Sequence, residues 1–148
     1  MLAFGHIALG YITGKIVSKA TDQSINIPAI WTLSLLPDID LLIPYLQHRG
    51  PTHSIIVALI IFTPLFIIAS WKAAPYFASL ASHSLIGDYL TGRTQLFWPL
   101  SLEWFEYERA MRLRSALELY TEFALFAVMI AILVLSRNLV HTRACNKW

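Results

Sequence analysis

Charged side chains are scarce in this chain of 148 residues. Only 14% of them are Asp, Glu, Lys or Arg, against about 25% in ordinary soluble domains. Hydrophobic residues make up 57%, and the mean hydropathy is +0.59. A soluble domain of this size is therefore excluded, and the composition predicts an integral protein of the cell (plasma or inner) membrane with several membrane passes.

Cysteine and basic clusters are also lacking. Cys145 is the single cysteine, so no disulfide can form within the chain and a thiolate metal site is not expected. No Lys/Arg-rich block alternates with aromatic residues, so we expect membrane lipid and not nucleic acid as a partner. The first residues lack the basic start of a signal peptide, and we expect this segment to be retained.

Five apolar segments predict an all-α, polytopic membrane bundle of about four to five helices in a single domain, residues 1–148. They span residues 2–17, 27–46, 54–71, 74–90 and 117–136. The third has 18 uncharged residues, close to the roughly 20 that a spanning helix needs, and Pro64 is expected to kink it. The first, second and fourth contain His and Asp, so we expect them to surround a polar cavity at one membrane face.

The longest connector, residues 93–115, mixes aromatic and charged side chains. This mixture predicts an interfacial segment, either a helix lying at the membrane surface or an aromatic-anchored linker. The tail, residues 137–148, is basic, which slightly favours a cytoplasmic C-terminus.

Ionisable side chains inside apolar segments usually serve a function. Seven occur here, including four of the five histidines and three of the four aspartates: His6, Asp38, Asp40, His48, His53, His83 and Asp88. If the helices alternate in direction, all seven lie at one membrane face. Imidazole and carboxylate groups are divalent-metal ligands, so we predict a metal centre, although polar residues are also simply tolerated at helix ends.

Two motifs sharpen this prediction. In the segment 35–40, Pro37 can open the helix so that Asp38 and Asp40 face one cavity, one binding a metal and the other bridging to a second ion or bonding a ligand histidine. The alternative is a Pro-Asp turn at a helix end. In the segment 48–54, a Gly-Pro turn can direct both histidines inward, and Thr52 or Ser54 can cap the next helix.

The remaining candidates carry weaker signals. His83 and Asp88 are five residues apart, about 140° around an ideal α-helix, so a π-bulge or unwound turn near Gly87 is needed to bring them together. His6, in a glycine-rich stretch, is either a ligand or a core histidine. Arg49 has the planar fork that grips a carboxylate or phosphate.

These motifs resemble the bacterial and archaeal family of integral-membrane metal-dependent hydrolases typified by YdjM and YbcI. The resemblance covers most of residues 1–100, and the segments that carry it are 36–40, 48–54, 82–92 and 96–99, with His6 and Gly10. It implies a small helical membrane protein with a metal centre and hydrolase activity. The spacing from His83 to Asp88 is one residue longer than the family's usual His-x-x-x-Asp.

The sequence thus favours a metal-dependent hydrolase acting on a phosphate ester of a lipid or amphiphile through a metal-activated water. The expected cofactor is Zn²⁺ or Mn²⁺, as one ion or two. Asp40 would orient a histidine or accept a proton, and Arg49 would stabilise phosphoryl charge, which makes both candidate catalytic residues. The alternatives are a transporter coupled to protons or divalent cations, and a noncatalytic scaffold with a structural metal.

Overall fold

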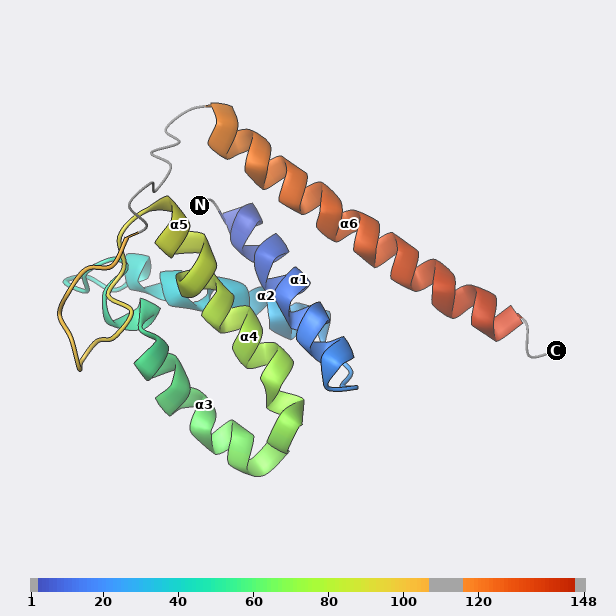
Figure 1. The fold of residues 1–148 in the computed structure, drawn as a ribbon, viewed down its shortest axis with the longest axis horizontal. Coiled ribbons are helices and arrows are strands. Elements are labelled where there is room, and N and C mark those ends of the chain that lie inside the picture. The colour runs from blue at the N-terminus through green and yellow to red at the C-terminus, as the bar shows by residue number, and fades with distance from the viewer. Residues whose placement is uncertain (1–2, 107–115, 146–148) are drawn as a thin grey trace.

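The computed structural model describes residues 3–106 and 116–145, with side chains for residues 3–106 and 119–136, and it is an all-α bundle (Figure 1). The α-helices are α1 (Ala3–Ala20), α2 (Ile27–Leu35), α3 (Ile55–Ala69), α4 (Ala74–Ser82), α5 (Tyr89–Thr91) and α6 (Ala116–Cys145). Three 3-10 segments, η1 (Leu36–Leu42), η2 (Pro51–His53) and η3 (Ser70–Ala73), and one π-helix, η4 (His83–Asp88), interrupt them. The predicted fold class is confirmed.

Local sequence signals set the helix starts. The Asn26 side chain caps α2 by accepting a hydrogen bond from the backbone N–H of Ala29 at 3.1 Å. Ser54 caps α3 by accepting from the N–H groups of Ile56 and Val57. Helix α3 continues through Pro64, so the predicted kink does not divide it.

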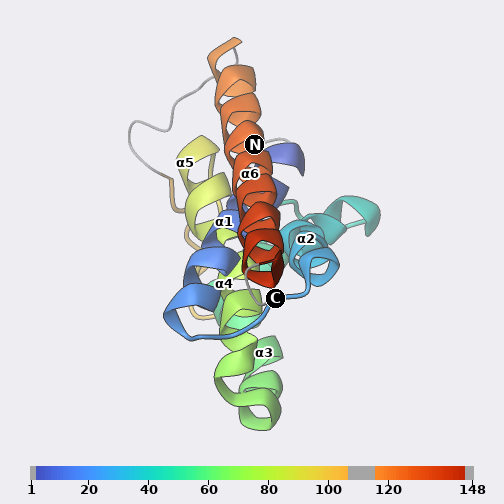
Figure 2. The same ribbon diagram turned by 90° about the vertical axis from the view of Figure 1, so that its right-hand side faces the viewer.

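Helix α1 lies at the centre of the bundle and packs against α2, α4 and α6 (Figure 2). Glycines allow this close approach: a Cβ atom at Gly10 would collide with the hydroxyls of Ser34 and Ser79, and one at Gly14 would lie 2.8 Å from Ile30 Cδ1. Small residues at helix contacts are typical of membrane bundles, where close packing replaces the hydrophobic effect between helices.

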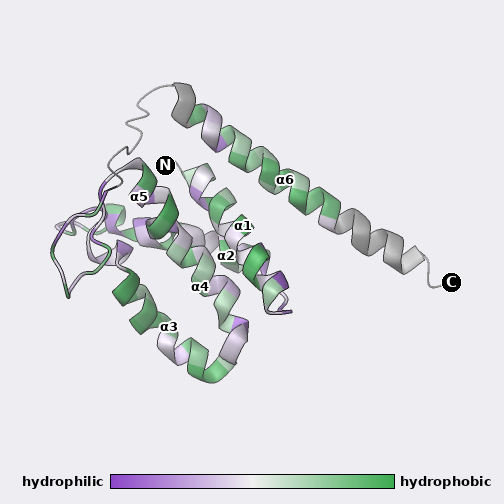
Figure 3. Cartoon of the chain, in the orientation of Figure 1, coloured by the Kyte–Doolittle hydropathy of each residue, from purple (hydrophilic) through white to green (hydrophobic). Residues whose placement is uncertain are grey.

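Two stretches of the described residues are long and apolar enough to cross a membrane, Ile55–Thr91 and Leu119–Ser136. The first folds back at Ser70 (φ 52°), so that α3 and α4 form an antiparallel hairpin. Hydrophobic residues run along much of α3 and the coloured middle of α6, and hydrophilic residues gather at the loops beside the end of α4 (Figure 3).

The connector differs from one sequence expectation. Residues 93–106 form turns and one isolated antiparallel bridge between Thr94 and Phe105, so the helix expected at the membrane surface is absent from this part. Residues 107–115, the rest of the connector, lie outside the described residues, as do residues 146–148 of the basic tail. The bridge matters because it returns the chain to the turn at Arg49, whose carbonyl accepts from the N–H of Gln95 at 3.0 Å.

Candidate metal centre

Four donor atoms from three short segments converge at one end of the α3–α4 hairpin. They are Asp38 Oδ1 from η1, His53 Nε2 from η2, and His83 Nε2 and Asp88 Oδ2 from η4. His53 Nε2 lies 3.0 Å from Asp88 Oδ2 and 3.5 Å from Asp38 Oδ1. His83 Nε2 lies 3.2 Å from Asp88 Oδ2, 3.4 Å from Asp38 Oδ1 and 3.2 Å from His53 Nε2. We call these four residues the ligand cluster.

The separations are those of ligands around one metal ion. Zn²⁺ bonds to nitrogen and oxygen at about 2.0–2.2 Å, which puts neighbouring ligands of a tetrahedral ion about 3.3 Å apart. Around an octahedral ion with bonds of about 2.1 Å, neighbouring ligands are about 3 Å apart. Five of the six separations within the ligand cluster are 3.0–3.5 Å, close to these values, and the sixth, between Asp38 and Asp88, is within 4.8 Å. The four donor atoms therefore lie close enough together to share one divalent ion.

Hydrogen bonds behind the two histidines direct their Nε2 lone pairs to the centre. His83 Nδ1 lies 2.6 Å from the carbonyl oxygen of Ser34, which can only accept, so Nδ1 donates. Thr52 donates its hydroxyl proton to Asp40 Oδ2 at 2.8 Å, and its oxygen accepts from His53 Nδ1 at 3.0 Å. When either imidazole is neutral, its proton therefore lies on Nδ1 and its Nε2 is free to bind an ion, as the Nε2 of a metal-bound histidine must be.

Arg49 engages one oxygen of Asp88 and leaves the other for the cluster. Its Nη2 lies 2.9 Å from Asp88 Oδ1, and its guanidinium occupies the space that a side chain at Gly92 would need. Asp88 Oδ2 is buried, its nearest polar neighbours are the Nε2 atoms of His53 and His83, and neither meets the geometric criteria of a hydrogen bond when the imidazoles are neutral. Leaving a buried acceptor unsatisfied costs about 1–3 kcal/mol, and more for a charged group. A cation at the centre would satisfy this atom.

Asp38 and His53 precede the first candidate span, and their pKa values shift in opposite directions. Burial raises the pKa of Asp38, but hydrogen bonds from His53 and His83 outweigh it and hold this pKa well below its usual value. Burial lowers the pKa of His53, but its hydrogen bonds to Asp38 and Asp88 outweigh that effect, and the net pKa is raised. A proton on the His53 imidazole thus helps to balance the carboxylates in the metal-free protein, and a bound cation would displace it.

Asp40 and His48 form a second group behind His53. Asp40 is buried; its Oδ1 lies 3.0 Å from His48 Nδ1, and its Oδ2 accepts from the N–H of Arg49 at 3.0 Å and from Thr52. His53 Nδ1 is 3.3 Å from the same oxygen. Because donors surround this carboxylate, we interpret Asp40 as the residue that orients His53. The donor atoms of Asp40, His48 and His53 also lie close enough together to share one ion, so the predicted second ion would bind here.

His6, from α1, lies against the ligand cluster without joining it. Its ring stacks on His83 with centroids 3.7 Å apart and an interplanar angle of 15°. Its Nε2 is 3.7 Å from Asp88 Oδ1, beyond hydrogen-bonding distance, and its Nδ1 is buried without a hydrogen-bond partner. Of the two predicted roles for His6, this position is nearer to that of a core histidine that covers one side of the site.

The structure brings all seven predicted residues together, for local reasons that the sequence indicated. Pro37 lies where α2 gives way to η1, as expected. The π-helix η4 absorbs the awkward spacing of His83 and Asp88, because its hydrogen bonds join residues five apart and so stack them. Sequence reasoning missed the carbonyl of Ser34, since a backbone acceptor has no signature in residue type, and the bond from Thr52 to Asp40.

Comparison with known proteins identifies the family of the chain. The profile of the YdjM inner membrane protein family matches residues 1–144, which include the whole ligand cluster. No curated protein and no solved structure matches the sequence at a significant level. The family match covers nearly the full length, and the two apolar stretches accord with a membrane location. The chain therefore belongs to the YdjM inner membrane protein family.

Proposed function

We propose that this protein is a multi-pass enzyme of the inner membrane that hydrolyses a phosphate ester of a lipid or another amphiphile with the help of a divalent metal. The observation that carries the proposal is the convergence of four donor atoms, two from histidines and two from aspartates, with five of their six separations at 3.0–3.5 Å. Mixed nitrogen and oxygen sites suit Zn²⁺ and Mn²⁺. Such an ion can bind a water molecule and a phosphoryl oxygen at its open positions.

Each residue of the site has a distinct task in this proposal. Asp38, His53, His83 and Asp88 would hold Zn²⁺ or Mn²⁺, which when bound lowers the pKa of water and stabilises charge on a phosphoryl oxygen. Asp40 keeps the His53 ring in its orientation. Three ligand side chains are at most 2% exposed, whereas Asp38 is 25% exposed. Water and substrate therefore approach from the side of Asp38.

Arg49 supports the site mainly through Asp88. Its ion pair with Oδ1 holds that carboxylate so that Oδ2 faces the two imidazoles. The guanidinium is 22% exposed, so its outer N–H groups remain near enough to solvent to meet a phosphoryl oxygen. Arg49 would then both position a ligand and stabilise the charge of the substrate.

The test is the metal content of the detergent-purified protein, measured by elemental analysis, together with turnover on a broad panel of phosphoesters. We expect stoichiometric metal and turnover in the wild type, and loss of both in Asp38→Ala and His53→Ala. The matched control is Asp22→Asn, since Asp22 is exposed, lies beyond the end of α1 and has a positive φ that Asn tolerates.

Other outcomes would overturn the proposal. A well-folded wild type that binds no Zn²⁺ or Mn²⁺ after addition of either ion would exclude a metal-dependent reaction. Stoichiometric metal without turnover on the whole panel would favour the scaffold with a structural metal. Cation flux into vesicles that depends on a proton gradient and on Asp38 would favour transport.

A further inference from the structure

An apolar pocket of about 210 Å³ lies between η1, η2, α3 and α4. Leu36, Pro37 and Ile39 form one wall, and Val57 and Ile61 form the opposite wall. Thr52 is the one polar lining residue. Such a lining has nothing to bind a charged or strongly hydrated group, so any ligand of this pocket is hydrocarbon.

The pocket adjoins the ligand cluster. Pro37 and Ile39 flank Asp38 directly in the chain, and neighbouring Cα atoms are only about 3.8 Å apart. Thr52 lines the pocket and contacts His53 Nδ1 at 3.0 Å. Asp38 is also the most exposed residue of the ligand cluster. The pocket therefore ends beside the accessible side of the metal centre.

The opposite wall belongs to a candidate membrane span. Val57 and Ile61 lie on α3, within the apolar stretch Ile55–Thr91. Ile61 is 54% exposed and the neighbouring Ile60 is 63% exposed, so this face of α3 is apolar and uncovered among the described residues. In a membrane such a face contacts lipid tails, which gives the pocket access from the bilayer.

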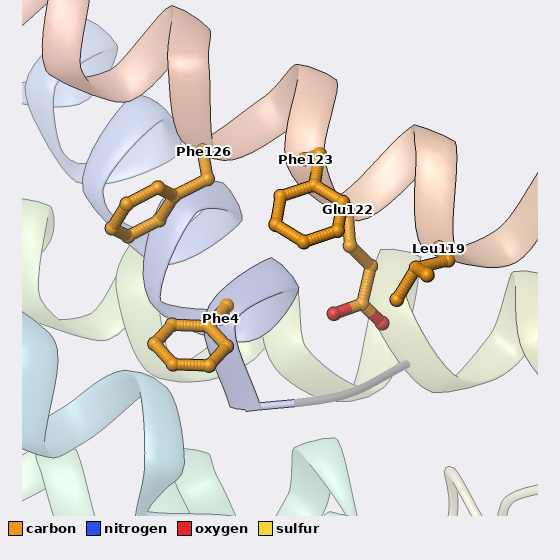
Figure 4. A pocket seen from close by; sticks show the side chains of 5 residues that line it. All are labelled: Phe4, Leu119, Glu122, Phe123 and Phe126. Carbon is orange, nitrogen blue, oxygen red and sulfur yellow. The ribbon is translucent and has the colours of Figure 1, made fainter.

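A second pocket, of about 190 Å³, lies between α1 and α6 and serves as a contrast (Figure 4). Phe4, Phe123 and Phe126 surround it, with Leu119 and Glu122. No residue of the ligand cluster lines this pocket or precedes or follows one that does. Of these two pockets, the one beside Asp38 adjoins the ligand cluster.

We propose that the pocket between η1 and α3 binds one acyl chain of the substrate, so that a lipid enters sideways from the bilayer and its phosphate reaches the ion held by the ligand cluster from the side of Asp38. The volume is below the about 300–1,000 Å³ of sites for drug-sized ligands, which suits a single narrow chain. The head-group chemistry in this inference rests on the proposed hydrolase function. The chain site itself rests only on the pocket and its position.

Photolabelling tests the chain site without any need for turnover. The protein is reconstituted in vesicles that contain a phosphatidic acid with a diazirine in its acyl chain, and labelled peptides are mapped by mass spectrometry. Ile67 and Ile68, which are 78% and 83% exposed, report contact with bulk lipid. We expect labelling at Leu36 and Val57 to exceed that baseline severalfold and to fall to it in Ile61→Trp. Equal labelling at both places would overturn the inference.

Turnover then tests whether the chain site serves the reaction. We expect Ile61→Trp to lower kcat/KM for a dioleoyl phosphomonoester at least about tenfold, while turnover of water-soluble p-nitrophenyl phosphate is unchanged. The control is Leu59→Trp, since Leu59 lies on α3, is 44% exposed and is outside the pocket lining. Equal losses on both substrates would overturn the inference. Labelling of the pocket without turnover of either substrate would instead refute the proposed hydrolase function alone.

Discussion

The two halves of the bundle differ in backbone geometry. Where α1 meets α2 and α6, regular helices pack through apolar side chains such as Tyr11, Ile30 and Met129. At the candidate metal centre, each residue of the ligand cluster lies on a 3-10 or π segment. His6 is the candidate that stands on a regular α-helix, and it is outside the ligand cluster.

The difference shows what irregular backbone contributes to this protein. On neighbouring turns of a regular α-helix, two side chains share one face only if they are three or four residues apart. The 3-10 turn at Asp38 and the π turn from His83 to Asp88 allow other spacings, so that donors separated in sequence face one point. Such departures weaken helical hydrogen bonding, and they typically occur at functional sites.

The largest effect is expected when a residue of the ligand cluster is replaced, compared with replacement of His6, which only covers the site. We expect Asp88→Asn to abolish stoichiometric metal binding, because it removes a charged donor that is 3.0 Å from His53 Nε2. We expect His6→Ala to retain stoichiometric metal with weaker affinity, because His6 only stacks on His83. Elemental analysis and chelator competition measure both. Metal retained in Asp88→Asn and lost in His6→Ala would reverse the assignment.

The π turn can be tested by changing its length. Deleting Leu85, which is 42% exposed, gives His-x-x-x-Asp, a spacing that a regular α-helix places on one face. We therefore expect the deletion to keep stoichiometric metal. Inserting one alanine after Leu85 gives a spacing of six, which neither helix type aligns, and should abolish binding. Circular dichroism confirms folding of both variants, and loss of metal in a folded deletion variant would contradict this account.

A smaller effect is expected behind the ligands. Asp40→Asn should weaken metal affinity by about 10–100-fold, typical of a lost partner of a ligand histidine, while stoichiometry at saturating metal is unchanged. Thr52→Val should weaken it less, since Asp40 still lies 3.3 Å from His53 Nδ1. Competition with a chromogenic chelator gives the affinities. A fall from two ions to one in Asp40→Asn would assign a second ion to Asp40, His48 and His53.

The most gradual expected change is a dependence of metal affinity on pH. The raised pKa of His53 means that a proton competes with the metal up to a higher pH than for an ordinary histidine. Metal affinity should therefore rise with pH by about tenfold per pH unit for each proton displaced, and level off above this pKa. Isothermal titration in buffers of different ionisation enthalpy counts the released protons. An affinity independent of pH from acid to neutral conditions would refute proton displacement at His53.

Much of this arrangement could be predicted from residue types. The apolar segments correspond to α1, α2 with η1, α3, α4 with its extensions, and α6, because apolar runs and their proline and capping signals act locally. The seven candidate residues were identifiable because ionisable groups are costly in apolar segments. For the connector, charge and aromatic content left a surface helix and a linker as alternatives, and residues 93–106 contain no helix because bonds such as that between Gln95 and the Arg49 carbonyl hold them in turns and irregular structure.

The amino-acid sequence by itself determined that the chain is helical, that it is a membrane protein and which side chains are available for metal chemistry. Only the tertiary structure decided that Asp38, His53, His83 and Asp88 form the ligand cluster, that Asp40 supports His53, and that His6 covers the site. The physical reason is distance. Donor geometry within a few tenths of an ångström depends on how η1, η2 and η4 pack, and on acceptors such as the Ser34 carbonyl that residue identity does not encode.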